Sequence, residues 1–129
     1  MKIPDNTQLY EGELYTFWFD TNGFLCAFAK NVDRSLDKQK KHFEFVRQIT
    51  DNKKVCFMAD TTNSKIINTE TREHSEREMP NLFKAIAILS DTALGKVNTV
   101  VFQNLNIQSV PLKTFSGEME AKEWLKLYL

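Results

Sequence analysis

The chain has 129 residues, and its 17 basic and 17 acidic side chains give a formal net charge of zero. This length suits one domain that closes a hydrophobic core without disulfides or metal, so we expect a single domain over residues 1–129 with an N-terminal arm at 1–12. The balanced charge excludes a global field that would steer nucleic acid toward the protein. No segment reaches the roughly 20 apolar residues of a membrane span, and the N-terminus has no secretory signal, so we expect a cytoplasmic protein.

Two aromatic-rich segments, 13–20 and 24–31, flank Thr21-Asn22-Gly23. Asn-Gly between such segments predicts a β-hairpin, because both residues tolerate positive φ. A hairpin that is open to water on one face would alternate more cleanly between apolar and polar residues, so we expect both faces to be covered. The aromatic candidates for a subunit interface or an apolar ligand cleft are Tyr15, Phe17, Phe19 and Trp18.

The rest of the chain alternates predicted helices and strands, because polar capping residues precede amphipathic segments and short apolar runs lie between them. The expected elements are a helix capped by Ser35, a strand at 54–60, a helix capped by Asn68 or Thr69 that reaches toward Pro80, a strand at 85–89, a helix capped by Asp91, an edge strand at 111–115 and a helix capped by Ser116. The order β-β-α-β-α-β-α-β-α predicts an α/β fold, in which a β-hairpin feeds three right-handed β-α-β crossovers. Its sheet would be five-stranded and mostly parallel, with helices packed on it.

A turn rich in hydroxyl and amide side chains follows the predicted strand at 54–60. Open α/β sheets bind ligands beyond the carboxyl ends of their strands, which makes this turn the candidate surface for a partner or ligand. Ordinary turn and capping chemistry also explains its composition. The candidate residues are Asp60, Thr61, Thr62, Asn63, Ser64, Asn68, Thr69 and Glu70.

The order of elements and two short patterns resemble the STAS-like fold of anti-sigma-factor antagonists and sulfate-transporter tails. The first pattern is Met58-Ala-Asp60, then seven residues, then Asn68-Thr-Glu, and the second is Pro111-x-Lys113-x-Phe115 followed by Glu120-Ala121-x-x-Trp124-Leu125. The resemblance extends from about Leu14 to the C-terminus and is closest to a family of small uncharacterised bacterial STAS/Sec14-like proteins.

This resemblance implies a non-enzymatic regulatory module that docks a protein partner, most readily a second copy of itself as a homodimer. The resemblance to Sec14-like proteins implies instead a carrier of a small apolar, lipid-like molecule. In the anti-sigma-factor antagonists, a serine in an Asp-Ser-Ser-Gly turn at this helix start is phosphorylated. The matching stretch here is 68–71, where Glu70 takes the place of the serine and no glycine occurs. Thr69, or Thr71, would take this role if the alignment shifts by one residue, and a phosphate on Thr69 would be favoured by the helix dipole.

Motifs for catalysis and for cofactors do not occur. None of the four glycines is placed to form a phosphate-cradling loop, and CxxC, HExxH and GxSxG are absent from the sequence. We therefore expect no enzymatic activity and no cofactor; an enzyme would need a polar cluster assembled from distant segments. Glu70, His74 and Glu78 recur at helical spacing, but neighbouring charges favour an ion-paired, solvated face over a metal site.

Two further features receive structural interpretations. The basic cluster from Arg34 to Lys41 is interpreted as a solvated face rather than a contact for nucleic acid or acidic lipid, because no aromatic residues are interleaved with it. Cys26 and Cys56 fall in predicted strands and are expected to be buried, reduced thiols.

Overall fold

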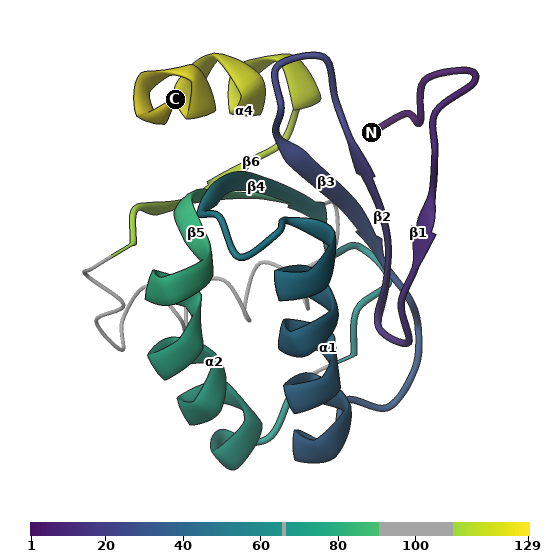
Figure 1. Cartoon of the computed structure of the whole chain (residues 1–129), viewed down its shortest axis with the longest axis vertical. Helices are drawn as coiled ribbons and strands as arrows, with labels where there is room; N and C mark the ends of the chain where they lie inside the picture. The colour runs from purple at the N-terminus through teal and green to yellow at the C-terminus, as the bar shows by residue number, and fades with distance from the viewer. Residues whose placement is uncertain (66, 91–109) are drawn as a thin grey trace.

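The computed structural model of the chain describes residues 1–65, 67–90 and 110–129 (Figure 1). The strands in this part of the chain are β1 Tyr10–Glu11, β2 Tyr15–Phe19, β3 Leu25–Ala29, β4 Val55–Asp60, β5 Phe83–Leu89 and β6 Leu112–Phe115. The helices are α1 Leu36–Ile49, α2 Thr69–Leu82 and α4 Glu118–Leu125, and a short 3₁₀ turn, η1 Lys126–Tyr128, follows α4. The predicted helix capped by Asp91 lies outside the described residues.

The strands form one sheet in the order β1-β2-β3-β4-β5-β6. The pairs β1–β2 and β2–β3 are antiparallel, and the remaining three pairs are parallel. This arrangement confirms the predicted mixed α/β fold, in which a hairpin leads into parallel strands. The structure adds β1, a two-residue strand of the N-terminal arm, to the five predicted strands. Two residues are too few to show an alternating pattern in a sequence.

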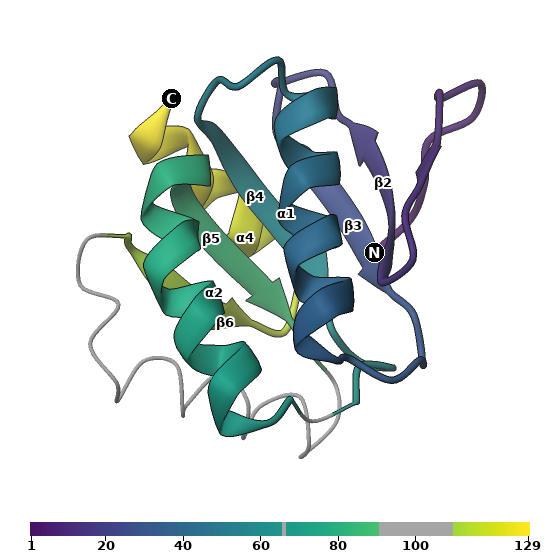
Figure 2. The ribbon, with the colours of Figure 1, turned by 60° about the horizontal axis from the view of Figure 1, so that its bottom comes forward.

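Helices cover both faces of the sheet. Figure 2 shows α1 and α2 side by side over one face, and in Figure 1 α4 lies on the other side of the sheet. In β4, Phe57 and Ala59 belong to the core cluster on the α1/α2 side, whereas Cys56 and Met58 belong to the cluster on the α4 side. Because both faces of β4 are buried, its sequence is a continuous apolar run rather than an alternating one.

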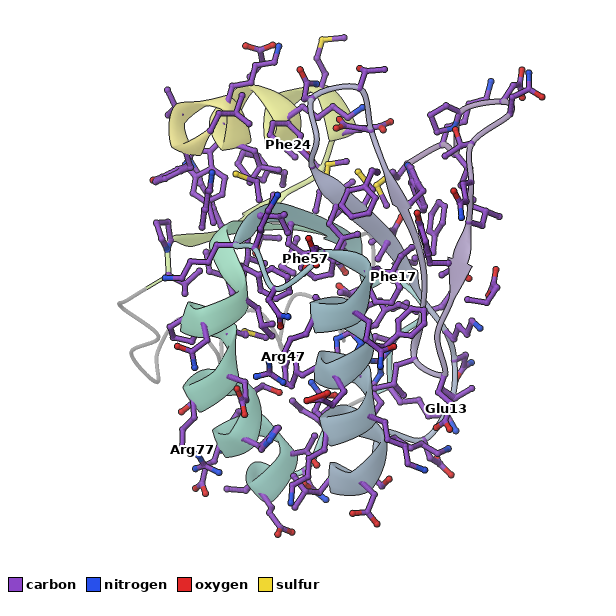
Figure 3. All side chains as sticks on the ribbon, in the orientation of Figure 1. Glu13, Phe17, Phe24, Arg47, Phe57 and Arg77 are labelled. Atoms are coloured by element: carbon purple, nitrogen blue, oxygen red, sulfur yellow. The ribbon has the colours of Figure 1, made fainter. Side chains whose placement is uncertain are left out.

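The chain itself buries both faces of the β2–β3 hairpin. Phe17 (labelled in Figure 3) is fully buried in the cluster on the α1/α2 side. Trp18 is 1% exposed in the cluster on the α4 side. The expectation that these two residues line an interface or an open apolar cleft is therefore wrong. For Tyr15 and Phe19, which are half-buried against the α1/α2-side cluster, it stays a prediction.

Capping side chains fix the starts of the first two helices. Ser35 Oγ accepts a hydrogen bond from the Lys38 amide, and Asn68 Oδ1 accepts one from the Thr71 amide, as the sequence predicts. The predicted cap of the last helix is wrong: α4 is capped by Gly117, one residue after Ser116, and no side chain bonds to its first amides.

Candidate functional site

The polar turn lies at the carboxyl end of the parallel strands. We call residues 60–64 and 68–70, which hold the eight candidate side chains, the β4–α2 rim. Asp60, the last residue of β4, is opposite Phe28 of β3 and Leu89 of β5. The rim therefore emerges from the middle of the sheet edge, where an open α/β fold places its binding site.

Backbone and side-chain hydrogen bonds fasten the first half of the rim to the sheet. Asp60 Oδ1 accepts from the Thr62 amide at 3.0 Å. The Thr61 amide donates to the Leu89 carbonyl at 2.9 Å, and the Thr61 hydroxyl donates to the same carbonyl at 3.5 Å. The Ser64 amide donates to the Thr61 carbonyl at 3.0 Å. These bonds hold the turn in one conformation, so ordinary turn chemistry accounts for Asp60, Thr61 and Thr62.

Ser64 does not present its hydroxyl to a ligand. The residue is 8% exposed, and its hydroxyl donates to the Lys65 carbonyl at 3.2 Å. Lys65 in turn forms an ion pair with Asp33, which lies in the loop before α1, at 3.3 Å. This exposed pair joins the two loops at the rim but adds little to stability, because water screens it.

The second half of the rim is the start of α2. Asn68 is used as the helix cap, with its Oδ1 2.8 Å from the Thr71 amide nitrogen. Thr69 and Glu70 follow in the first turn and are exposed. Thr71 is fully buried, so it cannot take the phosphate that the family resemblance implies. Thr69 is the hydroxyl at this helix start that a kinase could reach.

Buried polar residues join α1 to α2 behind the rim. Gln39 Nε2 donates to Ser75 Oγ at 2.9 Å, and the Ser75 hydroxyl donates to the Thr71 carbonyl at 3.0 Å. Sequence reasoning missed this contact. The signal that could have found it is the spacing of Thr71 and Ser75, two small residues four positions apart in an otherwise charged helix, which marks the buried stripe of α2.

One ion pair joins α2 to α1, and the pairs Arg72–Glu76 and His74–Glu78 lie within α2. Glu78 Oε2 is 2.5 Å from a guanidinium nitrogen of Arg47, which Figure 3 places between α1 and α2. His74 Nε2 is 3.8 Å from the other Glu78 oxygen, and burial lowers the pKa of His74. Within residues 1–65, 67–90 and 110–129, no group of three or more His, Cys, Asp or Glu side chains could hold a metal ion.

His42 and Arg34, beside the hairpin, are also more buried than the sequence suggests. His42 stacks on Phe17 with ring centroids 5.6 Å apart and an interplanar angle of 12°, and its burial lowers its pKa to about 3. His42 is therefore neutral near neutral pH and is not suited to acid–base chemistry there. Arg34 is 7% exposed, so its interpretation as part of a solvated basic face is wrong. Lys40 and Lys41 of the same cluster are exposed as expected.

Both cysteines are free and buried, as predicted. Burial raises the pKa of Cys26 to about 12 and also raises that of Cys56. A thiol with a raised pKa is a poor nucleophile, because the thiolate is the reactive form. Neither cysteine is a candidate for covalent catalysis at neutral pH.

Two shallow surface pockets lie along the outer side of α1. One, of about 190 Å³, is lined by Glu11, Gly12, Glu13, Lys41, His42 and Phe45. The other, of about 310 Å³, shares Lys41 and Phe45 and is lined otherwise by polar and charged residues. Both pockets open onto the surface, and neither is an enclosed cavity that would bury most of a ligand, so neither by itself supports a carrier of the lipid-like molecule that the Sec14-like resemblance implies. Among the helices that the structure describes, none combines the length and the hydropathy needed to cross a bilayer.

Comparisons with known proteins identify a family and a fold. A family model described as a domain of unknown function, DUF7793, matches residues 17–129. The crystal structure of an uncharacterized protein from the DUF3478 family of Shewanella loihica PV-4, which has a SpoIIAA-like fold, aligns with 92% of this chain and 91% of its own at a TM-score of 0.52. The sequence identity is 12%, so this likeness shows the fold alone. It confirms the STAS-like fold that the sequence resembles. No curated protein matches the chain.

Proposed function

Because the chain belongs to the DUF7793 family and has a SpoIIAA-like fold, we propose that it is a non-enzymatic regulatory module that docks a protein partner through the β4–α2 rim. The observation that supports this proposal is that the rim combines an ordered backbone with exposed side chains. Its backbone is fastened to β5 and capped at α2, whereas Asn63, Thr69 and Glu70 are exposed. A surface that is already ordered loses little conformational entropy on binding.

Phosphorylation of Thr69 is the regulatory step that we propose for this surface. Thr69 is the first residue of α2, and the positive end of the helix dipole favours an added phosphate there. The phosphate would also lie beside the exposed carboxylate of Glu70, and the resulting cluster of negative charge would favour a partner with a basic surface. We place this activity in the cytoplasm, which the two free thiols fit.

The test is site-specific photo-crosslinking in cells that express the chain natively. A photo-reactive amino acid replaces Asn63, which is exposed on the rim, or Lys54, which is exposed just before β4 at the opposite end of the sheet. We expect a crosslinked protein band from Asn63 that is absent from Lys54 and is weakened by Glu70→Arg. Mass spectrometry of the band then distinguishes a different protein from a second copy of this chain. Bands of equal strength from both positions, or none from Asn63, would contradict docking at the rim.

A further inference from the structure

The N-terminal arm reaches the rim from outside the part of the chain that the family model matches. Residues 1–9 precede β1 and form neither helix nor strand, and the family match begins at residue 17. The side chains of Met1 and Ile3 are half-buried and pack against the core cluster on the α4 side of the sheet. The other side chains of the segment, apart from the half-buried Thr7, are exposed: Lys2, Pro4, Asp5, Asn6, Gln8 and Leu9.

The arm contacts the first residue of the rim. The Met1 backbone nitrogen lies 3.9 Å from Asp60 Oδ2, and the other oxygen of this carboxylate holds the Thr62 amide. One carboxylate therefore joins the arm to the turn that forms the rim. Displacing Met1 would remove its contact with the Asp60 carboxylate, which also accepts the hydrogen bond from the Thr62 amide.

The arm is held firmly at one end and weakly at the other. At the firm end, β1 pairs with β2, Lys30 Nζ donates to the Gly12 carbonyl at 2.7 Å, and the same amine forms an ion pair with Glu11 at 3.0 Å. At the other end, the contacts are the partial burial of the Met1 and Ile3 side chains and one contact of 3.9 Å between the Met1 nitrogen and Asp60 Oδ2. Segments with few buried apolar contacts and no ladder hydrogen bonds open locally at low free energy.

We propose that residues 1–9 form a displaceable strap, hinged at Tyr10–Gly12, that shields the Asp60 end of the rim and the apolar surface under Met1 and Ile3. Partner docking displaces the strap, so strap release and docking are coupled. This inference rests on the proposed function, because it names what competes with the partner for the rim. A bound partner would cover the apolar surface that strap release exposes.

The test compares Ile3→Asp, which places a charge in the weak apolar contact, with Gln8→Asp, which places the same charge at an exposed position of the same arm. A chain lacking residues 2–8 serves as the second variant. Hydrogen exchange is followed by mass spectrometry on peptides that cover 58–65, and crosslinking from Asn63 is repeated in each background. We expect Ile3→Asp and the deletion to raise the exchange rate of the rim amides and the crosslink yield at least about threefold, and Gln8→Asp to change neither.

The possible outcomes distinguish failure of the strap proposal from failure of the docking proposal. Unchanged rim exchange in Ile3→Asp and in the deletion, with crosslinks intact, overturns the strap and leaves docking in place. A crosslink yield that falls when the strap is released also overturns it, because the arm would then be part of the docking surface. Loss of the Asn63 crosslink in every background overturns docking itself, and with it the coupling. Exchange in α1 peptides shows whether each variant is folded.

Discussion

The guanidinium carbon of Arg34 lies 4.7 Å from the centre of the Tyr15 ring. Its Nη2 donates to the carbonyls of Leu14, at 3.2 Å, and Lys30, at 3.4 Å. One side chain thus joins the start of β2 to the loop that leads from β3 into α1. Through the Lys65–Asp33 ion pair, this loop is also linked to the residue that directly follows Ser64 of the rim.

We expect Arg34→Lys to lower the free energy of unfolding by about 2 kcal/mol, because lysine keeps the charge but loses the planar donor fork and much of the stacking. The measurement is urea denaturation followed by circular dichroism. Lys40→Gln, at an exposed position of the same basic cluster, is the matched control and should stay within about 0.5 kcal/mol of the wild type. Equal midpoints for Arg34→Lys and the wild type would show that the Arg34 contacts add nothing.

His42 predicts a loss of stability in mild acid. Burial lowers its pKa from 6.5 to about 3 in the folded chain. As the pH falls from 7 to 5, the unfolded chain therefore takes up a proton at this position while the folded chain does not. The linkage relation gives a loss of about 2 kcal/mol over this interval, and the loss continues toward pH 3.

His42→Leu should remove most of this pH dependence, because leucine cannot take up a proton. The measurement is the urea midpoint at pH 7 and pH 5 for both proteins. His74, whose pKa is also lowered by burial, acts in the same direction and leaves a smaller residual slope. If His42→Leu and the wild type lose equal stability between the two pH values, His42 is not the buried neutral histidine described above.

Local signals in the sequence predict most of the fold. The Asn22-Gly23 turn forms with Gly23 at a φ of 83°, and Asp20 Oδ1 accepts from the amides of Asn22 and Phe24. The caps at Ser35 and Asn68 also depend on neighbours within three residues. Such features are encoded within a few positions, so they can be predicted without knowing which segments meet in space. The position of the turn between β4 and α2 is predicted for the same reason, since the turn follows directly from the end of β4.

What the sequence does not reveal depends on contacts between distant segments. Arg34 belongs to a run of basic residues, and only the approach of Leu14, twenty positions earlier, makes it a buried donor. Trp18 could have been covered by a second subunit, and packing in the α4-side cluster covers it within the chain instead. The hydroxyl of Ser64 is hidden by burial, which composition does not show. The sequence thus predicts where the candidate turn lies in the fold, but not which of its side chains are exposed.

Gly12 is closely packed, so a side chain at this position is expected to destabilise the protein. A Cβ atom there would lie 3.2 Å from the Tyr15 carbonyl oxygen, 3.3 Å from Phe17 Cε2 and 3.5 Å from Phe45 Cδ1. The first neighbour is backbone and the second is a buried ring, so neither yields easily. Gly12→Ala should destabilise the protein by about 1–2 kcal/mol through overpacking, measured as a shift of the urea midpoint. Glu13→Ala, at the exposed neighbouring position, is the control, and a Gly12→Ala protein as stable as this control would contradict the close packing.

The two thiols should be unreactive in the folded protein. Cys26 is 1% exposed and has a pKa of about 12, and Cys56 is 3% exposed, with its Sγ 3.7 Å from the Leu125 carbonyl oxygen. A colorimetric thiol reagent should modify both cysteines in denaturant and at least about a hundredfold more slowly in the native state, because reaction requires opening of the core. One rapidly reacting native thiol would show that the α4-side cluster is open to solvent.

The start of α4 offers a stabilising substitution. Gly117 is the cap residue, with an extended backbone conformation at φ −131° and ψ 147°, and no side chain bonds to the first amides of the helix. A Cβ atom at Gly117 would meet nothing within 4 Å. Gly117→Ser should therefore add a capping hydrogen bond and raise the free energy of unfolding by about 0.3 kcal/mol, since glycine is itself only a few tenths of a kcal/mol worse than serine as a cap. Ser116→Ala tests whether Ser116 is the cap instead. If it is, the substitution should lower the free energy of unfolding by about 1 kcal/mol. If Gly117 is the cap, as in the structure, the free energy of unfolding should hardly change. The measurement is thermal and urea unfolding of the two variants. A Gly117→Ser protein that is more stable than the wild type, together with a Ser116→Ala protein of unchanged stability, places the cap at residue 117.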